Sequence, residues 1–163
     1  MTMVETGALA PHFTLLGTDG REYGLPGDTA GRPILLVFFK TSCATCDLAF
    51  PYINRLRDAY PEKWHLWAIA QDPPQTASDY ARSHSMGYPV LIDAPDYSVS
   101  RLYDPPATPT LLLTDSSGRL IYSTHGFSKD DMNELAALVA RSVSAEPVII
   151  APENDGRPAF KPG

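Results

Sequence analysis

The sequence is short of cysteine and lacks both long apolar runs and basic clusters. Its 163 residues include two cysteines, too few for a disulfide framework, and a chain of this length can bury a core without one. No run approaches the roughly twenty apolar residues that a membrane-spanning helix needs. Lysine and arginine total 13 against 19 acidic residues, a net charge of -6. These absences exclude a disulfide scaffold and a membrane-spanning segment, and they argue against nucleic acid as a partner.

Residues 1–11 contain neither the basic start nor the apolar stretch of a secretory signal. We therefore expect a cytoplasmic protein, and an extracytoplasmic one only if a leader has been removed. With 44% apolar and 20% charged residues, the chain has the composition of one globular domain, expected over 1–146. A proline-rich tail, residues 147–163, follows it. Either the tail packs through Val148, Ile149 and Ile150, or it is disordered beyond the last helix.

Two continuous apolar segments predict the centre of the fold. Residues 34–39 and 64–70 each have the pattern of a strand buried on both faces, as in a parallel sheet. Between them, apolar residues recur at helical spacing over 43–59, with Pro51 inside the run. Strand, helix and strand in this order predict a right-handed parallel crossover.

The flanking segments predict smaller elements. Ser128 is expected to cap a terminal helix. Hairpins are expected at 13–16 with 23–25 and at 110–114 with 120–124, further helices at 76–84 and 97–103, and a further strand at 89–93.

Both cysteines lie in one motif, Cys43-Ala44-Thr45-Cys46, where a buried strand gives way to a helix. Unpaired backbone N–H groups and the positive end of the helix dipole favour a thiolate at Cys43, which we expect to be the exposed nucleophile. Its attack on a substrate disulfide forms a mixed disulfide, which Cys46, about one turn further along, can resolve. Thr41 or Ser42 is expected to cap the helix.

Two other interpretations of the cysteine pair compete with this one. A zinc site needs further ligands, but the histidines at 12, 65, 84 and 125 form no closely spaced pair. We therefore expect no metal. The other interpretation is a pair without catalytic chemistry.

With this order of elements the chain resembles the thioredoxin superfamily. Pro51, five residues after the second cysteine, matches the proline that kinks the active-site helix of thioredoxins. Thr108 and Pro109, which precede an apolar strand, resemble the cis-proline loop that faces the cysteines and offers an edge to the substrate. Gly126 resembles the glycine that leaves room for substrate beside them. The resemblance implies a thioredoxin-like α/β fold, a central mixed sheet flanked by helices.

The N-terminal hairpin and the helix-strand insertion over 72–103 resemble the redoxin branch of that superfamily. This branch holds the TlpA-like and ResA-like thiol-disulfide oxidoreductases and the peroxiredoxins. The similarity covers residues 7–142. It implies an enzyme without a cofactor that exchanges disulfides with protein substrates and with a redox partner protein.

Three residues depart from the family pattern. Ser42 replaces the tryptophan before the first cysteine, Val37 the buried aspartate of thioredoxins, and Ala49 the glutamate of ResA-like proteins. Proton transfer at Cys46 must therefore use water or another group.

Two basic residues are candidates for tuning the cysteines. His125 is expected on a loop beside the site, where it can shift the pKa of Cys43 or carry a proton. Lys40, if it turns toward the sulfur, stabilises the anion. The alternative for each is a side chain in solvent.

Two other activities on related folds remain as alternatives. A peroxiredoxin-like thiol peroxidase attacks with Cys43, but Lys40 and Leu36 occupy the threonine and proline positions of its P-x-x-x-T-x-x-C signature. A copper-binding Sco-like protein needs C-x-x-x-C and a histidine before the last hairpin, and residues 104–110 contain none. A thiol-disulfide oxidoreductase is the leading hypothesis.

Overall fold

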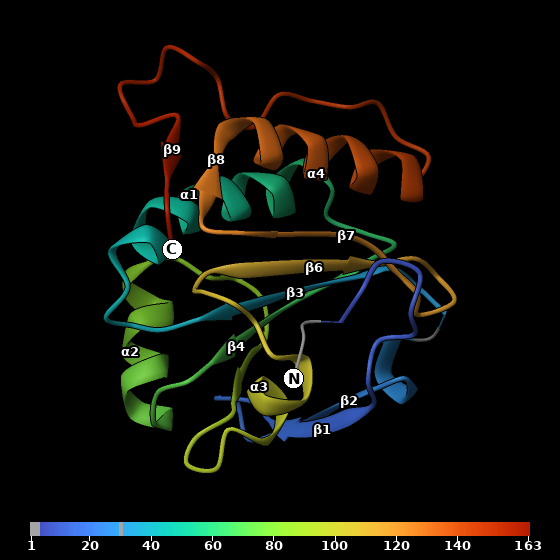
Figure 1. The fold of residues 1–163 in the computed structure, drawn as a ribbon, viewed down its shortest axis with the longest axis vertical. Coiled ribbons are helices and arrows are strands. Elements are labelled where there is room, and N and C mark those ends of the chain that lie inside the picture. Colours follow the sequence, from blue (N-terminus) through green and yellow to red (C-terminus); the bar gives the residue numbers. More distant parts are fainter. Residues whose placement is uncertain (1–3, 30) are drawn as a thin grey trace.

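A five-stranded mixed sheet forms the centre of the protein in the computed structural model, which describes residues 4–29 and 31–163 (Figure 1). Its strands are β3 (Ile34–Phe39), β4 (His65–Ala70), β5 (Val90–Ile92), β6 (Thr110–Thr114) and β7 (Leu120–His125). They lie in the order β5-β4-β3-β6-β7. The first three are parallel, and β6 is antiparallel to both β3 and β7.

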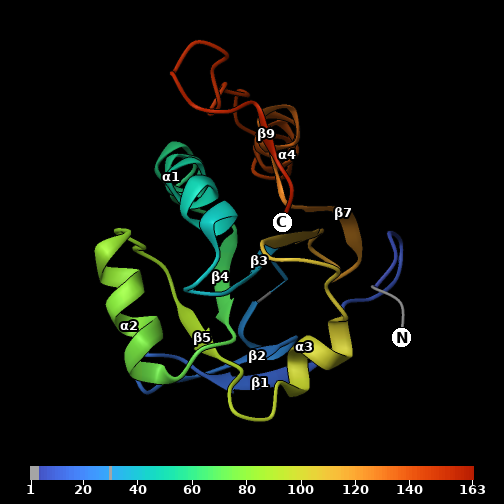
Figure 2. The ribbon, with the colours of Figure 1, turned by 60° about the vertical axis from the view of Figure 1, so that its left-hand side comes forward.

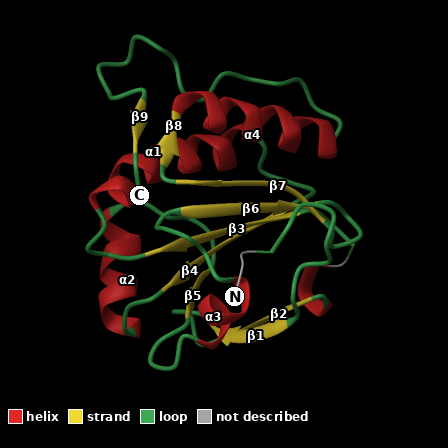
Figure 3. Cartoon of the chain, viewed as in Figure 1, coloured by secondary structure: helices red, strands yellow, loops and turns green. Residues whose placement is uncertain are grey.

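Helices cover one face of this sheet, and a helix with a hairpin covers the other (Figures 2 and 3). The first face carries α1 (Ala44–Ala59), α2 (Pro74–Ser83) and α4 (Lys129–Ser142). The second carries α3 (Ser98–Tyr103) and the hairpin of β1 (Phe13–Leu16) and β2 (Glu22–Leu25), after which comes the short 3-10 helix Gly27–Thr29. The predicted α/β class, a mixed sheet flanked by helices, is confirmed.

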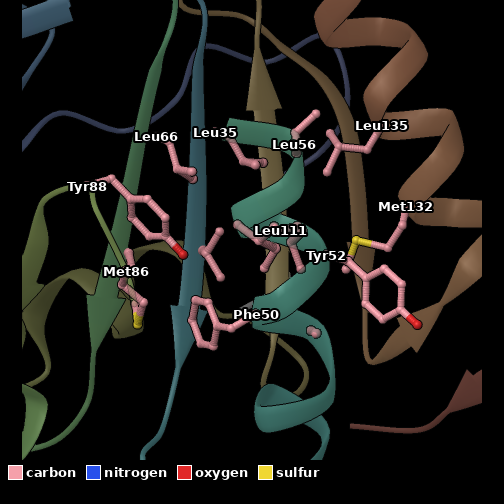
Figure 4. Close-up of a cluster of buried hydrophobic side chains, with 14 of the residues drawn as sticks. Leu35, Phe50, Tyr52, Leu56, Leu66, Met86, Tyr88, Leu111, Met132 and Leu135 are labelled. Atoms are coloured by element: carbon pink, nitrogen blue, oxygen red, sulfur yellow. The ribbon is translucent and has the colours of Figure 1, made fainter. Parts of the chain in front are cut away.

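β3 is buried along its whole length, and its side chains alternate between two cores. Every second residue, starting at Leu35, joins the core under α1, α2 and α4. The residues between them join the core under α3 and the hairpin. Figure 4 shows the first core, in which Phe50 and Leu56 of α1 lie over Leu35 and Leu111 of the sheet. The continuous apolar run in the sequence therefore reflects burial on both faces.

Both tryptophans lie in the first half of β4 or just before it. Trp64 is 3% exposed and Trp67 2%. Because β3 and β4 are parallel and His65 pairs with Ile34, this is the end at which β3 starts. The cysteine motif follows the other end of β3, after Phe39.

The predicted elements are all present, with small shifts at their ends. The helix expected at 76–84 begins earlier, at Pro74, because proline is compatible with a first helical turn. Ser128 caps α4 as predicted, its hydroxyl accepting a hydrogen bond from the Asp131 N–H at 3.2 Å. In the described ranges, no helix has the length and apolar character to cross a bilayer.

The tail packs against the domain, which answers one question that the sequence left open. Ile150 is buried, whereas Val148 and Ile149 are exposed. The Asn133 side chain in α4 accepts hydrogen bonds from the Ile150 and Ala151 N–H groups at 3.0 and 2.9 Å. Near its end the tail forms β9 (Phe160–Lys161), antiparallel to β8 (Phe127–Ser128). That pairing was not predicted from the sequence.

Candidate functional site

The cysteine motif lies at the junction of β3 and α1, where the sequence predicts it. Cys43 is the N-cap residue of α1, and its Sγ accepts a hydrogen bond from the Cys46 N–H at 3.1 Å. The prediction that Thr41 or Ser42 caps this helix is wrong, because the sulfur itself accepts the N–H. A negative charge on Cys43 is therefore placed where the helix dipole stabilises it.

The two thiols differ in their exposure. Neither is in a disulfide; Cys43 is half-buried and Cys46 is 0% exposed. Burial raises the pKa of the Cys46 thiol, and the interaction of its side chain with the Cys43 side chain raises this pKa further. Cys46 is therefore a neutral thiol at physiological pH, and Cys43 is the sulfur that solvent reaches.

The raised pKa of Cys46 makes the stability of the reduced protein pH-dependent. An unfolded cysteine loses its proton near pH 8.5, whereas folded Cys46 keeps it to higher pH. Above pH 8.5 the folded state thus binds more protons than the unfolded state. We expect Cys46 to contribute no pH dependence below that pH, and to lower the free energy of unfolding by up to about 1.4 kcal/mol per unit between pH 8.5 and 10.

Urea unfolding of the reduced protein at several pH values measures this slope, with Cys46→Ala as the control. The control retains Cys43 and every tyrosine, and an unfolded tyrosine titrates only near pH 10. The control should lose the part of the slope that Cys46 causes. Equal slopes in the two proteins would contradict the assignment.

The Thr108 loop faces the cysteines. The Cys43 thiol donates a hydrogen bond to the Thr108 carbonyl at 3.3 Å, and the Thr108-Pro109 peptide bond is cis. Strand pairing explains the approach: Thr110 at the start of β6 pairs with Phe38 near the end of β3. The segment before β6 therefore reaches the same edge of the sheet as the segment after β3.

Gly126 belongs to the same edge. Its φ of +70° lies in the left-handed region that favours glycine, and its N–H donates to the Pro109 carbonyl at 2.9 Å. The space beside it is filled by the tail. A Cβ added at Gly126 would lie 3.0 Å from the Gly163 nitrogen and 3.1 Å from the Lys161 carbonyl oxygen. The resemblance assigns this space to substrate.

Lys40 and His125 flank the site, and the Lys40 backbone carbonyl accepts a hydrogen bond from the Cys43 N–H at 3.3 Å. Both are exposed, and neither side chain makes a hydrogen bond or ion pair with another described residue. His125 pairs through its backbone with Thr110 at the start of β6. Their roles in tuning Cys43 stay predictions.

Asp72 is a residue that the sequence analysis missed. It follows β4, and its carboxylate accepts hydrogen bonds from the Thr41 N–H at 2.8 Å and the Thr41 hydroxyl at 2.9 Å. These bonds hold the loop between β3 and Cys43. The sequence contained enough to predict this contact, because Thr41 and Asp72 each follow a predicted parallel strand, and the carboxyl ends of adjacent parallel strands meet at one edge of the sheet.

A second polar cluster lies one turn into α1. The Tyr80 hydroxyl donates to the Asp47 carboxylate at 2.7 Å, and His84 Nε2 lies 3.4 Å from the same oxygen. Burial raises the pKa of Tyr80, and the bond to Asp47 raises it further. Across the part of the chain that the structure describes, no three His, Cys, Asp or Glu side chains gather as a metal site.

Comparison with known proteins gives a consistent family. The model of the AhpC/TSA family matches residues 6–123. The thiol-disulfide oxidoreductase ResA of Geobacillus thermodenitrificans (strain NG80-2) is 29% identical over 136 residues, 82% of this chain and 77% of the relative. ResA of Geobacillus kaustophilus (strain HTA426) is 30% identical over 121 residues, 73% of this chain and 68% of the relative.

Solved structures agree with the sequence relatives. The crystal structure of a putative thiol:disulfide interchange protein DsbE from Chlorobium tepidum superposes with a TM-score of 0.78 at 25% identity. The match covers 86% of this chain and 99% of that one. The predicted thioredoxin-like fold and the likeness to the redoxin branch are both confirmed.

Proposed function

The chain belongs to the AhpC/TSA family and is a ResA-like thiol-disulfide oxidoreductase, and from that premise we propose that Cys43 and Cys46 are the redox pair through which it exchanges disulfides with protein substrates. The observation that carries the proposal is the geometry of the two sulfurs. Cys43 is reachable and lies at a helix N-terminus, while Cys46 is buried and neutral, with its N–H 3.1 Å from the Cys43 sulfur.

The first step is attack by the Cys43 thiolate on one sulfur of the substrate disulfide. A bond forms between Cys43 Sγ and that sulfur, the substrate bond breaks, and the second substrate sulfur leaves as a thiolate that takes a proton from water. Once Cys43 is a thiolate, the Thr108 carbonyl no longer receives its proton. That carbonyl is then free to accept an N–H from the substrate backbone.

The second step is attack by Cys46 on Cys43 Sγ. The Cys46 thiol gives up its proton, a bond forms between the two enzyme sulfurs, and the remaining substrate sulfur departs and is protonated. Two electrons have passed from the cysteine pair to the substrate disulfide. A dithiol partner protein restores the pair by the reverse exchange.

The proton of Cys46 leaves through water in this proposal. Val37 and Ala49, which stand where related proteins carry acids, are apolar and 0% exposed. Neither position supplies a carboxylate beside Cys46. Because the thiol must ionise without such a base, we propose that the second step limits turnover at neutral pH.

Reduction of insulin disulfides by dithiothreitol, compared with consumption of hydrogen peroxide, tests the activity. We expect the protein to accelerate insulin reduction at least about tenfold over dithiothreitol alone. Peroxide consumption is expected to stay near the rate of a free thiol. Fast peroxide turnover without insulin reduction would replace this proposal by a thiol peroxidase.

A further inference from the structure

The last residues of the tail lie beside β8 and close to the start of α1 (Figures 1 and 2). β9 pairs with β8, with Lys161 opposite Phe127. The Pro162 carbonyl then accepts a hydrogen bond at 2.7 Å from the hydroxyl of Thr45, which stands between the two cysteines. Residues 160–163, here called the strap, therefore reach the first turn of α1.

Gly163 lies in close contact with the Thr108 loop. A Cβ added to it would lie 2.7 Å from the Thr108 carbonyl oxygen, 2.9 Å from the Ala107 Cβ and 3.3 Å from the Gly126 Cα. The same Thr108 oxygen accepts the Cys43 thiol. The strap thus covers the backbone edge on which an extended substrate segment would pair, while Cys43 itself stays half-buried.

The tail is held firmly before the strap and more lightly within it. Lys129 of α4 is 4% exposed, and its Nζ donates to the carbonyls of Pro152 and Glu153 and to the Asp155 carboxylate, at 2.9, 3.2 and 2.6 Å. The hydrogen bond from Lys129, and a second one from the Tyr52 hydroxyl, keep the pKa of Asp155 well below its usual range. Beyond Gly156 every residue is exposed. The strap can therefore lift while the anchor at Lys129 holds.

We propose that the strap determines which disulfides react. It occupies the substrate edge, so a disulfide in an extended protein segment must displace residues 160–163, whereas a small disulfide reaches Cys43 directly. The proposal rests on the proposed function of Cys43 and Cys46. It makes the tail a specificity element of the same site.

Two variants remove or displace the strap. Deletion of residues 160–163 retains the bond from the Lys129 N–H to the Ala159 carbonyl. Gly163→Val keeps the chain length. Its Cβ would lie 2.7 Å from the Thr108 carbonyl oxygen, and because that oxygen belongs to the backbone it cannot turn aside as the end of a flexible side chain could. Ile149→Ser is the matched control, because Ile149 is 71% exposed and lies elsewhere on the tail.

For each protein, kcat/KM is measured with insulin and with 5,5′-dithiobis(2-nitrobenzoate), a small disulfide. We expect both strap variants to raise kcat/KM for insulin about fivefold or more, because displacing the strap no longer opposes binding. The value for the small disulfide should change by less than about twofold in every variant. The control should match the wild type on both substrates.

Unchanged insulin kinetics in both strap variants would overturn the proposal. So would a loss of insulin activity, since the strap would then be a surface that helps bind the substrate. A full-length chain that reduces neither disulfide would instead overturn the proposed function. Thermal unfolding of each variant identifies one that has lost its fold, in which case the other variant decides.

Discussion

Cys43→Ser is expected to lower the rate of disulfide reduction at least about a thousandfold. The reason is chemical, because a serine hydroxyl is not ionised at the pH where the thiolate attacks. The N-cap position accepts serine well, so the helix should remain intact. Reduction of 5,5′-dithiobis(2-nitrobenzoate) by the purified variant, followed by absorbance, measures the effect. This small disulfide is used because it is expected to reach Cys43 without displacing the strap.

Cys46→Ser separates the two steps and serves as the matched control. The backbone N–H of residue 46 remains, so the hydrogen bond to Cys43 Sγ is retained. We expect this variant to attack at a rate near that of the wild type and then to stall as a mixed disulfide, visible as a mass increase. A Cys43→Ser variant that kept a tenth of the wild-type rate would remove Cys43 from its assigned role.

Phe50→Ala is expected to lower the free energy of unfolding by about 4 kcal/mol, roughly a thousandfold in the unfolding equilibrium. Phe50 is 0% exposed and packs edge-on against Phe39 of β3, with ring centroids 5.0 Å apart. Its ring also lies 5.9 Å from that of Tyr80 in α2. Phe50 lies between α1 and the sheet (Figure 4), so truncation opens a cavity there, and the regular elements around it limit collapse.

Urea unfolding of the reduced protein measures the loss, and Leu16→Ala is the comparison. Leu16 is also a large apolar residue, but it is 55% exposed, so its truncation should change stability by less than about 0.5 kcal/mol. Similar effects for the two variants would mean that Phe50 does not occupy a closely packed position. The experiment thereby tests how α1, and with it Cys43, is held on the sheet.

The sheet and the position of the cysteine motif could be predicted because they depend on local patterns. Ile34–Phe39 is apolar throughout because it is buried on both faces, and such a run has few interpretations. Ser128 caps α4, and its signal depends only on neighbouring residues. Local patterns do not predict that Thr108 lies beside Cys43. That prediction came from the resemblance to the thioredoxin superfamily.

The parts that were missed depend on contacts between residues far apart in the chain. Thr41 and Asp72 meet because two parallel strands end together, and Thr45 meets Pro162 across 117 positions. The tail has no periodicity, since its backbone is held mainly by single side chains such as Asn133 and Lys129. A proline-rich composition describes that segment equally well whether it packs or not.

The position of the two tryptophans decides how this protein can be observed. Trp64 precedes β4, and Trp67 pairs with Leu36 of β3; both are buried, and at least three further residues of β3, roughly 10 Å of strand, lie between them and the end of β3 that leads to the cysteines. Because thiols and disulfides quench indole emission only at short range, intrinsic fluorescence here should report global unfolding and stay silent during disulfide exchange. The oxidation state has to be followed by alkylation and mass, whereas a tryptophan placed at Ser42 would supply an optical signal beside the reacting sulfur.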